Sequence, residues 1–262
     1  MTKIALTIAG VDPSGGAGII ADIKTFFAFG VFPTAAISSI TFQNTQGVFG
    51  AEHQTAKSVR QQIEPILNDY EVAAVKTGML PTGEVIEEVA SILSERKLRN
   101  IIVDPVVRST SGYDLIDDHA LRSLINKLFP RSDLVTPNVP EAERITGIAI
   151  ENEDDIRDAA SIIRGFGAEN VLIKGGHLRR TANEARDYLF IGDERYVITA
   201  EFHETRATHG TGCTLSSAIA AGMALGNDLV SAVRRAKDFV NEAIQTAPMI
   251  GSGHSPINVR PT

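Results

Sequence analysis

The sequence predicts an α/β fold in which a mostly parallel β-sheet is covered by helices on both faces. Short apolar runs, typical of buried strands, alternate with longer segments of helical periodicity along the chain of 262 residues. Such alternation indicates parallel strands, since parallel neighbours need a crossover between them. One segment instead has two strand-like runs around Gly192 and Asp193, which predicts a β-hairpin and an antiparallel extension at one edge. We expect residues 1–262 to form a single domain.

The strand predictions rest on apolar runs bounded by glycine, proline or polar residues. The first run, "KIALTIAG" at residues 3–10, is almost continuously apolar, as in a strand buried on both faces. The other expected strands follow the same pattern and cover residues 34–42, 72–78, 101–107, 133–138 and 170–176, and the hairpin covers residues 186–202.

The helix predictions rest on apolar residues that recur with helical spacing. Residues 16–30 form the first helix, and Gly30 ends it. Its expected apolar face contains Ile19, Ile20, Ile23, Phe26 and Phe27. Residues 55–70 are helical, although Pro65 should end or kink this helix. The remaining expected helices cover residues 82–97, with Thr82 as the cap, and residues 117–129, 139–147, 153–167, 212–225 and 228–245.

Composition excludes several classes of protein. A formal net charge of -7 argues against a nucleic-acid partner or an anionic membrane surface. No apolar stretch approaches the roughly 18 residues of a membrane-spanning helix. A single cysteine excludes an internal disulfide framework. The amino-terminal run has the pattern of a first strand rather than of a signal peptide, so we expect a cytoplasmic protein.

Glycine, carboxylate, amide and lysine residues gather where the expected strands end. In open α/β sheets, ligands bind beyond the carboxyl ends of the strands. These strand-end segments are residues 10–18, Gln43, and residues 77–79, 104–107, 137–141 and 174–176. They form the kind of rim that phosphate and metal chemistry requires.

The segment "THGTGCT" places the only cysteine at the start of a helix, directly after two glycines. Gly210 and Gly212 allow the backbone to approach a ligand closely. The N–H groups of residues 211–214 lack helical partners and could bind an anion. In such an electropositive place the pKa of the Cys213 thiol should fall. The alternative is an ordinary helix start with a buried, inert cysteine.

A second group of oxygen ligands is expected around "VDPVV" and "TPNVPEAE". Asp104 ends one strand, and Asn138 and Glu141 are three residues apart at a helix start. Such oxygen ligands suit Mg²⁺, usually with waters completing its shell. The alternative is that Asn138 caps the helix and Glu141 completes a capping box.

Three further motifs each allow a ligand-binding and a structural interpretation. In "IKGGH", Lys174 could reach a nucleotide phosphate or could be a solvated lysine in a turn. In "TFQNTQG", Gln43 could pair with the edge of an aminopyrimidine, or it could belong to an exposed polar turn. The glycine-rich loop "AGVDPSGGAGIIAD" joins the first strand to the first helix, but it fits neither common phosphate-binding signature.

Together these motifs resemble the hydroxymethylpyrimidine/phosphomethylpyrimidine kinases of thiamine biosynthesis, which belong to the ribokinase-like superfamily. The resemblance spans nearly the whole chain and is carried by "TIAGVDPSGGAGIIADIKTF", "FQNTQGV", "VKTGMLP", "VDPVV", "TPNVPEAE", "IKGGH", "THGTGCTLSSAIAAGMALG" and "GHSPIN". It implies a ribokinase-like three-layer sandwich. It also implies ATP and Mg²⁺ as cofactors and a homodimer.

The same resemblance implies roles for individual residues. Gly210, Thr211 and Gly212 would form the anion hole, and Cys213 would act on the substrate hydroxyl as a base or as an orienting group. The other assignments are Gln43, Ala17, Asp22, Met79 and Val106 to the pyrimidine pocket, Lys174, Thr208 and Asn138 to the nucleotide, and Asp104 and Glu141 to the metal.

The expected activity is transfer of phosphate from ATP to hydroxymethylpyrimidine and then to its monophosphate. A pyridoxal kinase of the same fold is the nearest alternative, and Gln43 with Asn44 favours the pyrimidine. A non-catalytic pyrimidine sensor is a second alternative, which the intact "GTGC" motif argues against. A thiol redox protein would lack a second cysteine to resolve its intermediate.

Overall fold

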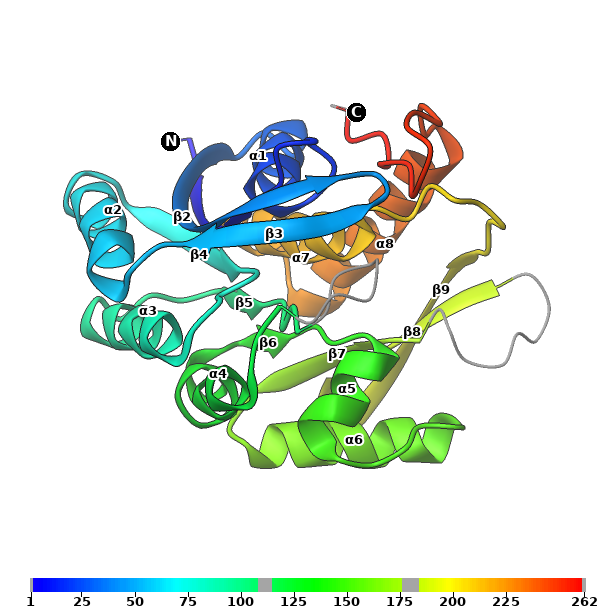
Figure 1. Ribbon diagram of the computed structural model, residues 1–262. Coiled ribbons are helices and arrows are strands. Elements are labelled where there is room, and N and C mark those ends of the chain that lie inside the picture. The colour runs from blue at the N-terminus through cyan, green and yellow to red at the C-terminus, as the bar shows by residue number, and fades with distance from the viewer. Residues whose placement is uncertain (1, 108–114, 176–183, 261–262) are drawn as a thin grey trace.

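The computed structural model describes residues 2–107, 115–175 and 184–260. In these residues one nine-stranded sheet runs through the molecule in the order β3-β2-β1-β4-β5-β6-β7-β8-β9 (Figure 1). The strands are β1 (Ile4–Val11), β2 (Phe32–Asn44), β3 (Gly47–His53), β4 (Val72–Thr77), β5 (Ile101–Val103), β6 (Leu134–Val135), β7 (Asn170–Lys174), β8 (Glu184–Ile191) and β9 (Glu194–Glu201).

Helices cover both faces of this sheet and bury one hydrophobic core on each. The core on one face is built with α1, α7 and α8, and the core on the other with α2 to α6. The helices are α1 (Gly18–Ala28), α2 (Ala56–Asp69), α3 (Gly83–Glu95), α4 (Asp118–Ser123), α5 (Val139–Thr146), α6 (Glu153–Gly165), α7 (Thr211–Ala224) and α8 (Leu229–Gln245). After α4 the chain continues as a π-helical turn, Leu124–Leu128, and a 3-10 turn, Phe129–Arg131. The predicted three-layer α/β sandwich is confirmed.

The sheet is parallel from β2 to β7 and antiparallel at both of its edges. The predicted hairpin is present, since β8 and β9 pair on either side of Gly192 and Asp193. The sequence interpretation placed an antiparallel extension at one edge, and this was incomplete because β3 pairs antiparallel with β2 at the other edge. The segment that forms β3 is short, contains two glycines and is nowhere fully buried, so it lacks the apolar run of a core strand.

One detail of the predicted helices was wrong, and one of the two alternatives left open for Pro65 is excluded. Ile23 and Phe27, expected on the buried face of α1, are 36% and 66% exposed, and Asp22 is buried instead. The polar residue is accommodated because it has charged and hydroxyl partners inside the protein. The second helix does not end at Pro65 but continues to Asp69. Pro65 lies on the exposed side of α2, where water can reach the carbonyl that loses its helical partner.

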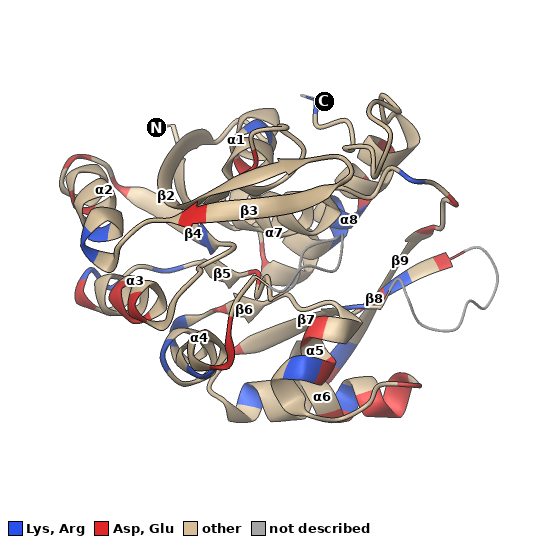
Figure 2. Cartoon of the chain, in the orientation of Figure 1, with Lys and Arg blue, Asp and Glu red and all other residues tan. Residues whose placement is uncertain are grey.

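Charged side chains are unevenly distributed over the elements. They are dense on α2, α3 and α6, whereas the β2–β3 hairpin is almost free of them (Figure 2). Glu52 is the single acidic residue in these two strands, which contain neither lysine nor arginine. Within the described residues, no helix has both the length and the apolar character needed to cross a membrane.

Candidate active site

Two glycine-rich loops from opposite ends of the sequence pack against each other. One joins β1 to α1, and the other precedes α7. Gly210 adopts a φ of 86°, and a side chain there would collide with the carbonyl oxygen of Gly16. Gly18 adopts a φ of 55°, and a side chain there would collide with the carbonyl oxygen of Gly10. Only glycine permits both the positive φ and this close approach of the backbones.

Asp12 organises the contact between these loops. Its carboxylate accepts hydrogen bonds from the backbone N–H groups of Ser14 at 2.8 Å, Gly16 at 3.1 Å and Ala17 at 2.8 Å. It also accepts one from Nε2 of His209 at 2.7 Å. Burial raises the pKa of Asp12, but the hydrogen bonds from His209 and Ser14 outweigh it and lower the pKa to about 2. The carboxylate is therefore ionised and fixes both loops. The sequence analysis gave this aspartate no role.

The first turn of α7 presents unpaired backbone N–H groups. Gly210 precedes the helix and offers no side chain to cap it. In the part of the chain that the structure describes, no acceptor is assigned to the N–H groups of Gly212 and Cys213. The N–H of Thr211 donates only a long bond, of 3.4 Å, to the carbonyl of Thr208. This arrangement is the one expected for an anion-binding helix start.

Lys174 lies beside this helix start and is held by two carboxylates. A Cβ atom built on Gly212 would lie 3.3 Å from Nζ of Lys174. The same Nζ is 3.0 Å from Oδ1 of Asp104 and 3.9 Å from Oε2 of Glu141. Burial lowers the pKa of Lys174, but the charges of Asp104 and Glu141 together raise it by more. The net pKa is raised, so the side chain is an ammonium. Strands β5 and β7 and helix α5 thus bring these three groups to the start of α7.

The capping-box interpretation of Asn138 and Glu141 is confirmed. The side chain of Asn138 accepts from the N–H of Glu141, and the carboxylate of Glu141 accepts from the N–H of Asn138, each at 2.8 Å. Burial and the nearby Asp104 raise the pKa of Glu141 to about 7, although Lys174 opposes this. A positive charge nearby favours the ionised form of a carboxylate, so a bound cation would lower the raised pKa of Glu141.

The environment of the Cys213 thiol differs from the predicted one. The backbone N–H of Gly18 donates to the sulfur, as an electropositive site requires. Burial nevertheless raises the pKa of the thiol to about 11, and Asp22 and Asp104 raise it too, against the opposing effect of Lys76. The expectation of a lowered pKa was wrong because burial and two carboxylates outweigh the helix start. The group at this position is a thiol at neutral pH.

Three residues assigned to the pyrimidine pocket lie in the segments that follow β1, β4 and β5. Ala17 directly precedes Gly18, whose N–H holds the sulfur. The sulfur of Met79 would lie 3.3 Å from a Cβ atom built on Gly10, at the end of β1. Val106 donates its N–H to the carbonyl of Asp104 at 2.8 Å, in the turn that follows β5.

Gln43 lies on the part of β2 that extends beyond the end of β1. The last β1 residue, Val11, pairs with Ile40, and Gln43 is three positions further along β2. A register shift occurs directly before it, and its partner across the hairpin is Val48. The side chain is half-buried. Gln43 therefore lies past the end of β1, on the side of the sheet where the parallel strands end.

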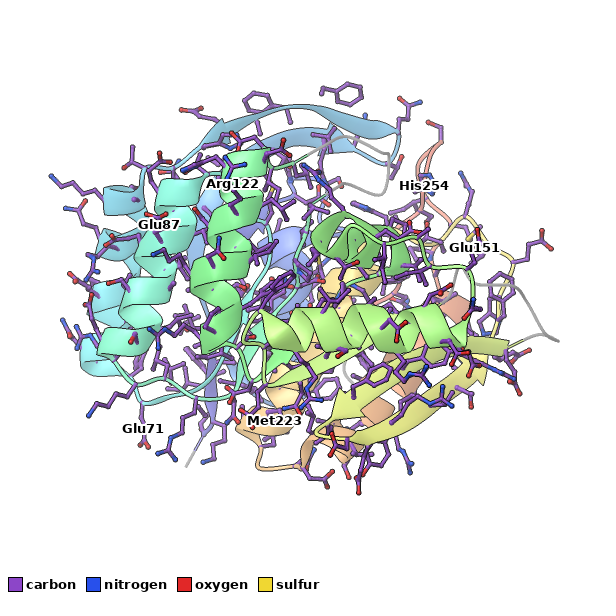
Figure 3. All side chains as sticks on the ribbon, turned by 90° about the horizontal axis from the view of Figure 1, so that it is seen from below. Glu71, Glu87, Arg122, Glu151, Met223 and His254 are labelled. Carbon is purple, nitrogen blue, oxygen red and sulfur yellow. The ribbon has the colours of Figure 1, made fainter. Side chains whose placement is uncertain are left out.

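The C-terminal loop, residues 250–258, contacts both the β2–β3 hairpin, which contains Gln43, and the loop before α7. The N–H of His254 donates to the carbonyl of Thr45 at 2.7 Å, and Nδ1 of His254 is 3.1 Å from the hydroxyl of Thr208. His209 donates to the carbonyl of Ser255. Figure 3 shows His254 far from Met223, which lies in the last turn of α7. The hydroxyl of Thr208, assigned to the nucleotide, is thus engaged with this loop.

Asp22 was assigned to the pyrimidine pocket, and this role stays a prediction, because the structure shows only that the residue is fully buried. Its side chain has no exposed surface, and Lys76, Thr7 and Ser217 donate to its two oxygens at distances of 2.6 to 3.0 Å. The sequence analysis missed Lys76. The signal was present, because a lysine in the apolar run "VAAVKTG" of a buried strand needs a partner.

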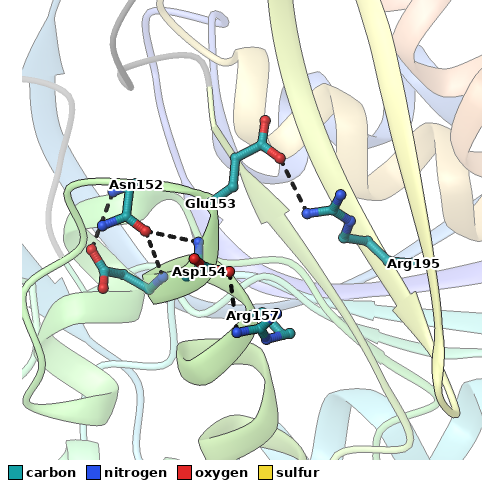
Figure 4. A pocket seen from close by; sticks show the side chains of 6 residues that line it. Asn152, Glu153, Asp154, Arg157 and Arg195 are labelled. Atoms are coloured by element: carbon teal, nitrogen blue, oxygen red, sulfur yellow. Dashed lines mark hydrogen bonds and ion pairs between the residues drawn. The ribbon is translucent and has the colours of Figure 1, made fainter.

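A polar pocket of about 580 Å³ lies elsewhere, at the start of α6. Four of the five charged side chains that line it are paired with one another (Figure 4). Glu153 binds Arg195 at 3.1 Å, and Asp154 binds Arg157 at 3.1 Å. It contains no residue assigned to substrate, nucleotide or metal.

Comparison with known proteins gives a consistent result. Residues 12–258 match the model of a family described as phosphomethylpyrimidine kinase. A protein of Haemophilus influenzae named hydroxymethylpyrimidine/phosphomethylpyrimidine kinase is 44% identical over 258 residues, which cover 98% of this chain and 96% of that protein.

Solved structures agree. The phosphomethylpyrimidine kinase of Clostridium difficile superimposes with a TM-score of 0.82 and 42% identity, over 93% of this chain and 100% of that one. The pyridoxal kinase of Staphylococcus aureus in complex with AMP-PCP and pyridoxal gives a TM-score of 0.91 at 30% identity, over 100% of this chain and 94% of that one.

Proposed function

Since the chain belongs to the phosphomethylpyrimidine kinase family, we propose that the residues around Cys213, Lys174 and the start of α7 carry out its phosphoryl transfer. The protein is a kinase of thiamine biosynthesis. It uses ATP to phosphorylate hydroxymethylpyrimidine to the monophosphate and then to the diphosphate. The observation that supports this site most directly is the meeting of a free helix start, a partly buried lysine and a thiol where the strands end.

Each residue has a role that its position supports. In the first step the substrate hydroxymethyl oxygen bonds to the γ-phosphorus of ATP, and the bond from that phosphorus to the β,γ-bridging oxygen breaks. ADP leaves with the bridging oxygen, and the hydroxyl proton is released to water. The N–H groups of Gly212 and Cys213 and the ammonium of Lys174 stabilise the charge on the phosphoryl group. The Cys213 thiol orients the hydroxyl by hydrogen bonding. Its raised pKa argues against a preformed thiolate base.

We propose that Mg²⁺ accompanies ATP in this site. The described residues contain no group of three or more metal-ligating side chains. Mg²⁺ needs no such group, since it is often held by one or two carboxylates together with substrate phosphates and waters. Asp104 and Glu141 supply two carboxylates beside Lys174. The raised pKa of Glu141 is the shift expected of a carboxylate whose charge is not fully neutralised until a cation binds. The ion would neutralise charge on the phosphates.

The substrate assignment is tested by one assay. Hydroxymethylpyrimidine, its monophosphate and pyridoxal are compared as acceptors at equal concentration, with ADP release as the measurement. We expect both pyrimidines to be phosphorylated with a higher kcat/KM than pyridoxal. Preference for pyridoxal would overturn the assignment of Gln43 to a pyrimidine, and no ADP release with any acceptor would contradict the kinase activity itself.

We further propose that the chain folds as one domain and forms a homodimer through the β2–β3 hairpin. Ile40, Phe42 and Phe49 on this hairpin are 40%, 52% and 69% exposed, and the hairpin is nearly uncharged. Strand β3 of this hairpin is the outermost strand on its side of the sheet, and among the described residues its outer edge has unpaired backbone groups. An apolar, uncharged edge of this kind favours association with a second copy.

Light scattering after gel filtration tests the dimer. Phe49→Glu should shift the mass toward 28.1 kDa, the mass of one chain. Val197→Glu, at an exposed apolar position on the edge strand at the other side of the sheet, is the matched control and should leave the mass unchanged. A wild-type protein of monomer mass would refute the dimer.

A further inference from the structure

Lys76 is a buried lysine that the phosphoryl transfer described above does not use. It lies within the buried part of β4, and its side chain is 0% exposed. Nζ lies 3.0 Å and 2.9 Å from the two oxygens of Asp22, which is also 0% exposed. An ion pair so deeply buried is rarely a net source of stability, because removing two charges from water costs several kcal/mol. Its position therefore calls for another explanation.

The ion pair connects three elements directly behind the Cys213 thiol. Asp22 lies one turn after Gly18 in α1, and the N–H of Gly18 donates to the sulfur. Oδ1 of Asp22 accepts from the hydroxyl of Ser217 at 2.7 Å, and Ser217 lies one turn after Cys213 in α7. Lys76 thus ties both neighbours of the thiol, α1 and α7, to strand β4.

Lys76 also lies directly beneath the rim at the end of β4. A Cβ atom built on Gly78 would lie 2.8 Å from its Nζ. Gly78 is followed by Met79, one of the residues assigned to the pyrimidine pocket. The ammonium is consequently separated from the site by little more than a glycine backbone.

We propose that Lys76, fixed by Asp22, is a positioning residue that holds the Cys213 thiol against the substrate hydroxyl and supplies the positive charge behind it. This inference rests on the proposed role of Cys213 in the reaction. Lys76 touches neither substrate nor nucleotide in this proposal, and acts through the sulfur and through the two helices that carry it.

The electrostatics of the thiol agree with this geometry. After burial, Lys76 has the largest effect on the pKa of Cys213 and lowers it, whereas Asp22 and Asp104 raise it. Lys174, on the other side, is also coupled electrostatically to Cys213. These four groups are the charges that face the sulfur from β4, α1, the turn after β5, and β7.

The rate of alkylation of the thiol by iodoacetamide at pH 8 to 9 tests the proposal without using the kinase reaction. Cys213 is the only cysteine, so the signal has a single source. Lys76→Met should slow alkylation about tenfold and Asp22→Asn should accelerate it about tenfold, because one pKa unit changes the thiolate fraction tenfold. Loss of structure alone would expose the sulfur and accelerate alkylation in both variants. In variants whose circular dichroism shows the wild-type fold, changes in the same direction, or none, would overturn the proposal.

The variant with both substitutions, Asp22→Asn with Lys76→Met, keeps the test valid if a single variant does not fold. It leaves no unpaired buried charge, so it should fold with a Tm close to that of the wild type. We expect kcat for the pyrimidine to fall at least about tenfold with little change in the KM for ATP, because the thiol loses its support. A folded double variant with wild-type kcat would overturn the proposal. The role of Cys213 is tested separately, since Cys213→Ala with full turnover would remove the thiol from the reaction without changing the alkylation results.

Discussion

Asp12 and His209 are 197 residues apart in the sequence and are joined by a hydrogen bond of 2.7 Å. This bond connects the loop that holds Ala17 and Gly18 with the loop that opens α7. The substrate side and the phosphate side of the proposed site are therefore aligned by one carboxylate and one imidazole. Mutation of either group should affect both sides together.

Asp12→Asn should destabilise the protein in a pH-dependent way. The pKa of Asp12 is lowered from 3.8 to about 2 in the folded protein. A group with a lowered folded pKa stabilises the protein above its unfolded pKa and loses this contribution as the pH falls through its folded pKa. The stability difference between wild type and variant should thus shrink by up to about 2 kcal/mol between pH 5 and pH 2. Urea unfolding at several pH values measures this. Ser14→Ala, which leaves the bond to His209 intact, should show a smaller change.

Gly210→Ala should abolish activity and reduce stability. The residue has a φ of 86°, which costs a side chain about 1–2 kcal/mol, and the new methyl group would also collide with the carbonyl of Gly16. Gly226→Ala is the matched control, because Gly226 has a φ of 92° but no atom within 4 Å of the added carbon. We expect the control to lose stability only, and to keep kcat within twofold. Equal activity losses in both would contradict a special role for the loop contact.

Cys213→Ala should reduce kcat by roughly 10²-fold while nucleotide affinity stays within about twofold. The backbone N–H groups at the start of α7 remain in the variant, so the phosphates keep their partners. Cys213→Ser retains a hydrogen-bonding group and should preserve more activity than alanine does. Calorimetric titration with an ATP analogue and steady-state kinetics measure the two effects. Near-native turnover of the alanine variant would exclude the thiol from the reaction.

Lys174→Met should lower kcat/KM for ATP by roughly 10²- to 10³-fold. The substitution removes the ammonium beside the helix start and leaves Asp104 and Glu141 close together without their shared cation. The remaining activity should require a higher Mg²⁺ concentration, because the metal alone then has to balance the negative charges of both carboxylates. Initial rates across a Mg²⁺ series measure this. Lys127→Met, which removes an exposed lysine on the π-helical turn, should behave as the wild type does.

Gln43→Ala should raise the KM for hydroxymethylpyrimidine about tenfold or more and leave the KM for ATP unchanged. Loss of a hydrogen bond to a buried polar group costs about 1–3 kcal/mol. Asn44→Ala is the matched control: its side chain accepts from the N–H of Gln46 within the turn. If the two variants raised the KM equally, Gln43 would have no specific role in binding the pyrimidine.

Much of the fold could be predicted from sequence because its signals are local. Thr82 caps α3 as expected, and Gly147 ends α5 in the left-handed conformation. Lys174 was predicted to reach the rim at the strand ends because parallel strands end together, whereas Gly210 was assigned to the site by the resemblance alone. The structure shows Lys174 beside the helix start that Gly210 precedes.

The errors concern properties that depend on distant contacts. The pKa of Cys213 could not be derived from its own helix start, because Asp22, Asp104 and Lys76 come from three other segments. The partner of Lys76 is 54 residues away. Strand β3 was missed because its stability comes from pairing with β2 rather than from its own composition.

The C-terminal loop has a practical consequence for engineering. Its contacts with Thr45 and Thr208 make residues 250–258 part of the frame around the rim, whereas β1 begins at the opposite ends of the parallel strands. A reporter or immobilisation tag fused to the carboxyl end would pull on the turn next to Gln43. A tag attached at the amino end would lie away from the strand ends that form the proposed active site.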